Sequence, residues 1–61
     1  MNISGQRLKA LRLDAGLTQK QLSERLGITT RTIISIEKDE PAAIDSLSVK
    51  NLKKWWRICQ A

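Results

Sequence analysis

Apolar residues recur at helical spacing along this chain, in short stretches that glycine or proline separates. Leu8, Leu11 and Ala15 follow a period of about 3.6 residues, the period of an amphipathic helix. This spacing predicts a first helix from about Ser4 to Ala15. Gly16 follows directly, and a glycine just past the last turn commonly ends a helix.

A second helix is predicted to begin at Thr18. Thr18 and Gln21 match the T-x-x-Q capping box, in which two side chains satisfy free N–H groups at a helix start. Leu22 and Leu26 give this helix one buried stripe, and Gly27 closes it.

Thr29 is the predicted N-cap of a third helix that runs to about Lys38. Pro41 prevents a smooth continuation, so Asp39 to Leu47 is expected to be an acidic surface loop. A last helix begins between Ser46 and Asn51 and runs to the chain end. No segment predicts a strand, and the fold class is therefore all-α.

The third helix divides into two faces when residues are placed at about 100° each. Its inner face carries Ile33 and Ile36, which we expect to pack against Leu22 and Leu26. Its outer face carries Thr30, Arg31, Ile34, Ser35 and Lys38. The polar groups among these are the hydroxyls of Thr30 and Ser35, the guanidinium of Arg31 and the ammonium of Lys38. Taken singly these are ordinary surface residues.

Residues 17–37 place two short amphipathic helices around one glycine, which is the layout of a helix-turn-helix. In that arrangement the second helix lies in the DNA major groove. There Arg31 can donate two hydrogen bonds to O6 and N7 of guanine. Thr30 and Ser35 can donate to a base edge or accept from it, and Ile34 can contact a thymine methyl group. These four residues are the predicted base-reading set.

Composition agrees with a nucleic-acid partner. Eleven Lys and Arg against six Asp and Glu give the 61-residue chain a formal net charge of +5, which suits an anionic ligand. The length allows a single domain, residues 1–61, whose core is marginal.

Several classes of function are disfavoured. The chain has no histidine and one cysteine, Cys59, so disulfides, a zinc site and a catalytic triad lack their residues. We expect no enzyme activity and no cofactor. The sequence shows no export signal and no apolar run of membrane-spanning length, which favours a cytoplasmic protein.

The last helix has an apolar face and a basic face. The apolar residues that share one side are Leu52, Trp55, Trp56 and Cys59, and the cations on the other are Lys50, Lys53, Lys54 and Arg57. Leu52 and Trp55 are predicted core residues, whereas Trp56 lies at the edge and is a candidate dimer contact. The cations suit either phosphates beside an operator or an acidic protein partner.

The motif T-Q-x-x-L-x-x-x-L-G-I-T-x-x-T-I-x-x-I-E at residues 18–37 closely resembles the phage-repressor and Cro-like helix-turn-helix family, also called the xenobiotic-response-element type. The preceding R-L-x-x-L-R at residues 7–12 resembles that family's first helix. The resemblance implies a compact four- to five-helix bundle of lambda-repressor-like type that binds near-palindromic operators in double-stranded DNA, usually as a homodimer.

Carried over by position, the resemblance implies roles for individual residues. Gln19 would contact the DNA backbone, Thr18 and Lys38 would lie near phosphates, and Thr30, Arg31 and Ser35 would contact bases. Arg12 and Glu37 would form a charged pair that joins the first helix to the end of the third. Two features depart from the family: the connection after the third helix is acidic, and the chain ends at Gln60-Ala61, where relatives continue into a fifth helix.

The leading interpretation is a sequence-specific transcriptional regulator that acts as a repressor. The alternative is the antitoxin of a toxin–antitoxin pair, which binds a toxin protein as well as its own promoter. In that case the loop Asp39 to Asp45 or the Trp56 face would carry the toxin contact.

Overall fold

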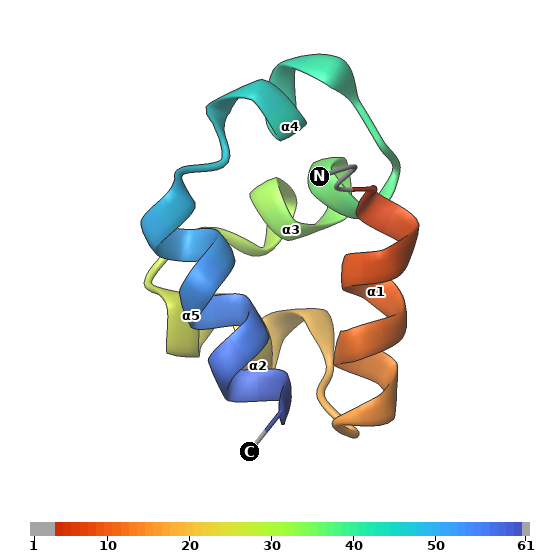
Figure 1. Cartoon of the computed structure of the whole chain (residues 1–61), viewed down its shortest axis with the longest axis vertical. Helices are drawn as coiled ribbons and strands as arrows, with labels where there is room; N and C mark the ends of the chain where they lie inside the picture. The colour runs from red at the N-terminus through yellow and green to blue at the C-terminus, as the bar shows by residue number, and fades with distance from the viewer. Residues whose placement is uncertain (1–3, 61) are drawn as a thin grey trace.

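The computed structural model describes residues 4–60, which form five α-helices and no strand (Figure 1). The helices are α1 (Gly5–Asp14), α2 (Gln19–Leu26), α3 (Thr30–Glu37), α4 (Pro41–Ser46) and α5 (Val49–Gln60). The all-α prediction and the bounds of the first three helices are confirmed. None of the five helices in this part of the chain is both long and apolar enough to cross a membrane.

The second and third helices begin at the predicted caps, and Ser4, the predicted start of the first helix, is its N-cap. The Ser4 hydroxyl accepts the N–H of Arg7, and the Thr29 hydroxyl accepts the N–H of Thr32. At the start of α2, both arms of the capping box with Thr18 are formed. These side chains satisfy backbone donors that have no partner inside their helix.

The segment predicted as a loop contains a helix, and in this respect the prediction was wrong. Helix α3 ends at Glu37, before Pro41, and Pro41 starts α4, because proline at the first helical position has a suitable φ and lacks an N–H that would be unpaired anyway. Ala42 and Ala43 follow it and favour the helix. Residues 4–60 therefore form five helices, within the four- to five-helix bundle implied by the resemblance, although the local patterns indicated only four. Ser48 caps the last, since its hydroxyl accepts the N–H of Asn51 at 3.1 Å.

The core lies where α1, α2, α3 and α5 meet. Its buried apolar side chains are Leu8, Leu22, Leu26, Ile33, Ile36 and Trp55. Trp55 is fully buried, and its indole N–H donates to the carbonyl oxygen of Leu8 at 3.1 Å. Leu52 and Cys59 pack against this cluster, and burial raises the pKa of the Cys59 thiol although Arg12 and Arg25 act in the opposite direction.

The start of α1 meets the end of α3 at very short range. A Cβ atom built on Gly5 would lie 1.9 Å from the carbonyl oxygen of Ile36, so only glycine fits there. The N–H of Gly5 donates to Asp39 Oδ1 at 2.5 Å, directly after α3. Asp39 has a φ of 59°, in the left-handed region that side chains rarely adopt. This junction fixes α1 against the third helix.

Candidate nucleic-acid interface

Helices α2 and α3 form a rigid pair around a tight turn. Gly27 ends α2 with a φ of 74°, a left-handed conformation that glycine adopts at little cost. The carbonyl oxygen of Ser23 accepts the N–H groups of both Gly27 and Ile28, at 2.9 and 3.1 Å. Beyond the turn, Ile33 and Ile36 enter the same core as the leucines of α2, as predicted. The inner face of α3 is thereby fixed, and its opposite face is directed away from the core.

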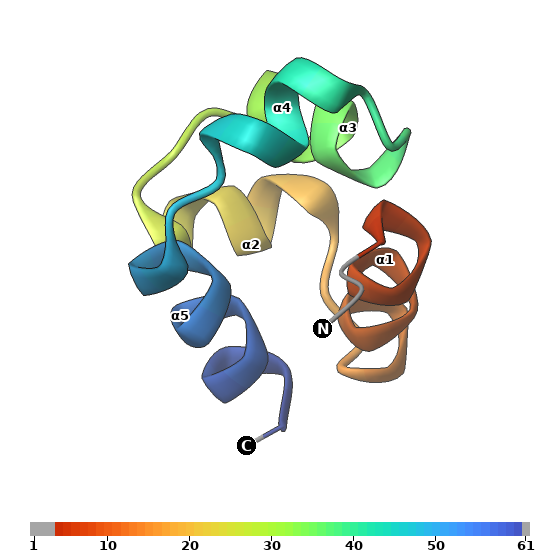
Figure 2. The ribbon, with the colours of Figure 1, turned by 45° about the horizontal axis from the view of Figure 1, so that its top comes forward.

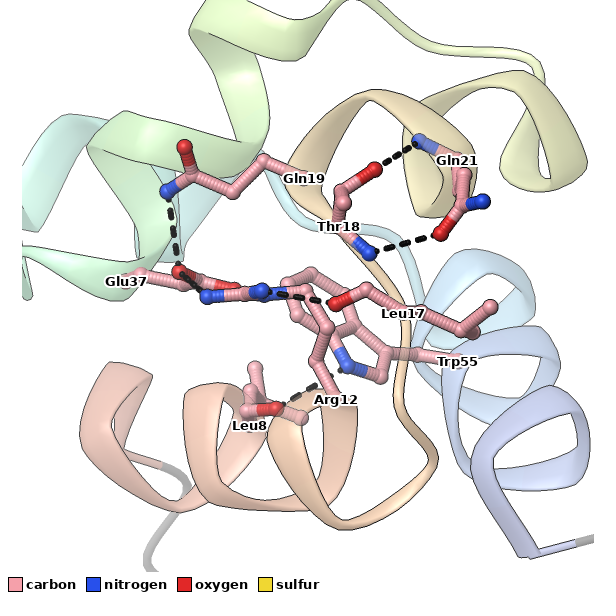
Figure 3. A network of polar contacts seen from close by, with 8 residues as sticks. All are labelled: Leu8, Arg12, Leu17, Thr18, Gln19, Gln21, Glu37 and Trp55. Atoms are coloured by element: carbon pink, nitrogen blue, oxygen red, sulfur yellow. Dashed lines mark hydrogen bonds and ion pairs between the residues drawn. The ribbon is translucent and has the colours of Figure 1, made fainter.

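A buried ion pair joins α1 to the end of α3 (Figure 3). Arg12 donates from Nε to Glu37 Oε2 at 2.6 Å and from a terminal nitrogen to Oε1 at 3.0 Å. A further guanidinium N–H donates to the carbonyl oxygen of Leu17 at 2.8 Å. Because this oxygen lies just before α2, one guanidinium connects the three helices that carry the candidate interface.

Gln19, the first residue of α2, is attached to the same pair. Its side-chain Nε2 donates to Glu37 Oε1 at 3.1 Å, so Figure 3 shows its amide directly above the ion pair. A glutamine amide has two N–H groups and a carbonyl oxygen, and the contact with Glu37 uses one of the N–H groups. Gln19 is half-buried, and its remaining amide groups can meet a ligand in an orientation that Glu37 has already fixed.

Thr18 lies beside Gln19 at the N-terminus of α2. Its hydroxyl accepts the N–H of Gln21 at 3.0 Å, while its own N–H donates to the Gln21 side chain at 2.9 Å. The side chain is exposed and keeps its hydroxyl proton for an outward acceptor. Helix N-termini favour anions through their free N–H groups and their dipole. This end of α2 therefore suits a phosphate group.

The predicted base-reading residues on α3 differ in exposure. Arg31 is exposed, whereas Thr30, Ile34 and Ser35 are half-buried. The Thr30 hydroxyl lies 3.1 Å from the hydroxyl of Ser23 on α2, which holds its rotamer. Ile34, which was predicted to lie on the outer face of the helix, is partly covered by its neighbours. Of these four residues, Arg31 is the exposed one, and its long side chain can reach furthest from the helix.

Lys38 is exposed at the C-cap of α3, next to a group of acidic residues. Asp39, Glu40 and Asp45 are all exposed on the connection and on α4. Their charge would repel phosphates, and the carboxylate of Asp39 is already bonded to the N–H of Gly5. At the C-terminal end of α3, Lys38 is therefore the residue that can attract a phosphate.

The sequence patterns did not predict the roles of two residues that support the interface, Ser23 and Asp39. Ser23 is buried, and besides contacting Thr30 its hydroxyl donates to the carbonyl oxygen of Lys20 at 2.8 Å. Its position three residues before Leu26, on the buried stripe of α2, was the available signal. Asp39 bonds to Gly5 across 34 residues, and no local pattern announces such a contact.

Comparison with known proteins agrees with this geometry. Residues 8–59 match the sequence model of a helix-turn-helix family. The match includes α2, α3 and both members of the Arg12–Glu37 pair. Neither a curated protein nor a solved structure matches the chain.

Proposed function

The chain belongs to the Cro/C1-type helix-turn-helix family of DNA-binding regulators, and on that premise we propose that it is a transcriptional repressor that recognises one operator sequence in the cytoplasm. Bound at a promoter, it would repress by occluding the DNA. The observation that carries this proposal is the joint placement of Gln19 and α3. Glu37 is the last residue of α3, the helix that carries the candidate reading residues, and its buried carboxylate accepts a hydrogen bond from Gln19 at the start of α2. This bond orients the glutamine relative to α3.

In the proposed complex, the N-terminus of α2 binds a phosphate and sets the depth at which α3 enters the major groove. Thr18 and Gln19 make this contact with hydroxyl and amide groups, without net charge. Lys38, at the other end of α3, adds an ionic phosphate contact. Phosphate contacts at both ends fix the register of the helix on the duplex.

The bases are then read by the outer face of α3. Arg31 donates two hydrogen bonds to O6 and N7 of one guanine, and Thr30 and Ser35 bond to adjacent base edges. Ile34 makes an apolar contact with a thymine methyl group. Because Ser23 holds the Thr30 hydroxyl, this residue reads with a restricted rotamer and little loss of entropy.

Two copies bound to a near-palindromic operator are proposed, because a single short helix contacts few base pairs. In such complexes the half-sites lie about one helical turn apart, on the same side of the duplex. The protein is proposed to dimerise at least on DNA.

The test is a titration by fluorescence anisotropy of labelled duplex DNA from upstream of the gene, against a scrambled duplex of equal length. Both duplexes are measured at two salt concentrations, since affinity for DNA depends steeply on salt. The proposal expects the upstream duplex to bind about 10³-fold more tightly or better. Equal, salt-sensitive binding to both duplexes would contradict sequence-specific recognition.

Arg31→Ala tests the reading role directly. It is expected to weaken operator binding by about 1–3 kcal/mol and to relax preference at a single base pair. Arg7→Ala, at an exposed arginine on α1, is the matched control for lost charge. If Arg31→Ala weakened operator and scrambled DNA equally, Arg31 would be a phosphate contact instead.

An antitoxin role is the second candidate, and the observation in its favour is the exposed Trp56 on α5, which is 58% accessible. Large exposed aromatic side chains are typical of protein-binding sites. A toxin-like gene beside this one, and co-purification of its product with the chain, would support this role. A repressor acting alone requires neither.

A further inference from the structure

The outer face of α5 is separate from the α2–α3 interface and has a different chemistry. Lys50, Lys53, Lys54 and Arg57 line a partly open hollow of about 330 Å³. We call this surface, together with the adjacent exposed Val49 and Trp56, the α5 face. In Figure 2, α5 lies at the lower left of the molecule, whereas α3 and α4 lie at the top.

The four cations are not neutralised within the described chain. Helix α5 contains no Asp or Glu, and the ion pair found in residues 4–60 is that between Arg12 and Glu37. Lys50 and Lys54 are four residues apart, as are Lys53 and Arg57, so like charges face each other on neighbouring turns. Such pairs destabilise a helix.

The position of Lys50 adds to this imbalance. It is the second residue of α5, near the end where the helix dipole favours negative charge, and the first turn has no acidic residue. A bound anion would relieve both the repulsion and the unfavourable dipole contact. The α5 face is therefore complementary to negative charge.

Two apolar side chains lie beside the cations. Val49 and Trp56 are seven residues apart on one side of α5, and they are 67% and 58% exposed. The phosphate groups of duplex DNA offer no apolar surface to cover them, and the deoxyribose carbons between the phosphates offer little. Tryptophan and arginine together are instead the residues most enriched where binding energy concentrates in protein interfaces.

A second copy of this chain does not suit the α5 face. A symmetric contact places the same surface of each copy against the other. It would bring the four cations of one α5 against those of its copy, and like-charge juxtaposition across an interface is costly. The occupant must carry the opposite charge.

We infer that the α5 face binds an acidic segment of a different protein, with carboxylates that pair with Lys50, Lys53, Lys54 and Arg57 and an apolar side chain that covers Trp56. This site does not depend on the proposed DNA-binding function, because it uses none of the residues assigned to DNA, although it shares Trp56 with the antitoxin candidate. Recruitment of the acidic partner to an operator would follow only in combination with the proposed DNA-binding function, on which this step rests.

The test uses a fluorescein-labelled peptide of repeating Glu-Glu-Leu. Two companion peptides replace every Glu by Gln or every Leu by Glu. Anisotropy is expected to show salt-dependent binding of the Glu-Glu-Leu peptide, binding of the all-Glu peptide about tenfold weaker, and no binding of the Gln version. The intrinsic tryptophan emission should shift to shorter wavelength as the peptide covers Trp56.

Variants separate the two contributions. Lys53→Gln/Arg57→Gln is expected to weaken peptide binding about tenfold or more, and Trp56→Ala to abolish the emission shift and weaken binding by a similar factor. The matched control, Arg7→Gln/Lys9→Gln, removes two charges from exposed positions of α1 and should leave binding within about twofold. Arg31→Ala should also leave peptide affinity unchanged, which separates a failure here from a failure of the DNA-binding proposal.

Three results would overturn the inference. The first is absence of peptide binding at low salt. The second is binding of scrambled duplex DNA that Lys53→Gln/Arg57→Gln abolishes and that causes no emission shift, which would make the α5 face a phosphate-binding surface. The third is salt-sensitive self-association in sedimentation that Trp56→Ala prevents, which would make a second copy the occupant.

Discussion

The guanidinium of Arg12 and the carboxylate of Glu37 form a two-point ion pair across 25 residues, with their side chains only 7% and 3% exposed. Both carboxylate oxygens are used by Arg12, and the third guanidinium contact goes to the carbonyl oxygen of Leu17. The pair is therefore well satisfied by hydrogen bonds despite its burial. Such a pair is costly to desolvate and still more costly to break.

Removing one partner should destabilise the protein far more than removing both. Glu37→Leu leaves the buried charge of Arg12 without a partner and is expected to cost about 3–5 kcal/mol of unfolding free energy. A chain of this size has about that much in total, so the variant should be largely unfolded. The double variant Arg12→Met/Glu37→Leu should recover most of the loss. Urea unfolding followed by circular dichroism measures both.

An exposed arginine on the same helix provides the control. Arg7→Met should change the unfolding free energy by no more than about 0.5 kcal/mol. If the double variant were as unstable as Glu37→Leu, the cost would come from lost packing and not from an unpaired charge.

Gly5→Ala should destabilise the protein, although alanine is the better helix former by about 0.5–1 kcal/mol. The added Cβ would lie 1.9 Å from the carbonyl oxygen of Ile36, a backbone atom that cannot turn aside. We expect a loss of about 1–3 kcal/mol in urea unfolding. Gln6→Ala, at the next and exposed position, should be within about 0.5 kcal/mol of the wild type. Stabilisation by Gly5→Ala would show that α1 and α3 are not in close contact.

Substitutions of Asp39 should separate its backbone strain from its hydrogen bond. Asp39→Asn keeps an oxygen for the N–H of Gly5 and tolerates the φ of 59°, so it should be closest to the wild type. Asp39→Gly removes the bond but relieves the left-handed backbone, so it should cost no more than about 1 kcal/mol. Asp39→Ala loses the bond and adds a left-handed alanine, at about 1–2 kcal/mol more. Equal thermal stabilities of the glycine and alanine variants would exclude the contribution from φ.

Local patterns in the sequence predicted the elements that depend on neighbouring residues. The capping box at Thr18 and the αL glycine at Gly27 act within one turn of chain, and the structure has both where predicted. The apolar stripe of Leu22 and Leu26 likewise identified the core face. Helix α4 was missed because Pro41 was interpreted only as an end of α3, although the same residue suits a helix start.

Contacts between distant residues were beyond such patterns. The bond from Gly5 to Asp39, and that from Trp55 to the carbonyl oxygen of Leu8, join residues 34 and 47 positions apart. The link from Gln19 to Glu37 depends on how α2 crosses the end of α3, which helical periodicity does not determine. The resemblance to known repressors named Gln19 and Glu37 for separate roles. The structure shows that one side chain holds the other.

Gln19 and Lys38 should weaken DNA binding in different ways. Gln19→Ala removes a neutral contact, so affinity should fall equally for operator and scrambled DNA while the dependence on salt stays the same. Lys38→Ala removes an ionic contact and should lower the slope of log K against log salt by about 0.9. Anisotropy titrations over a salt series measure both slopes. A changed slope for Gln19→Ala would indicate that Gln19 acts through the Arg12–Glu37 pair and not on phosphate.

The two tryptophans should have opposite fluorescence. Trp55 is fully buried and bonded to the carbonyl oxygen of Leu8, whereas Trp56 is 58% exposed. Trp56→Phe, which keeps Trp55, should therefore emit at short wavelength and resist quenching by iodide. Trp55→Phe keeps Trp56 and should emit at long wavelength with efficient quenching. It should also lose stability, because the smaller ring leaves a cavity and the Leu8 oxygen loses its donor. Iodide is an anion and could be attracted by the positive charge of α5, so the experiment is repeated with acrylamide, a neutral quencher. If exposure causes the difference, acrylamide should also quench Trp56 more than Trp55. Equal quenching of both variants by acrylamide would contradict the packing of α5 against α1 described above.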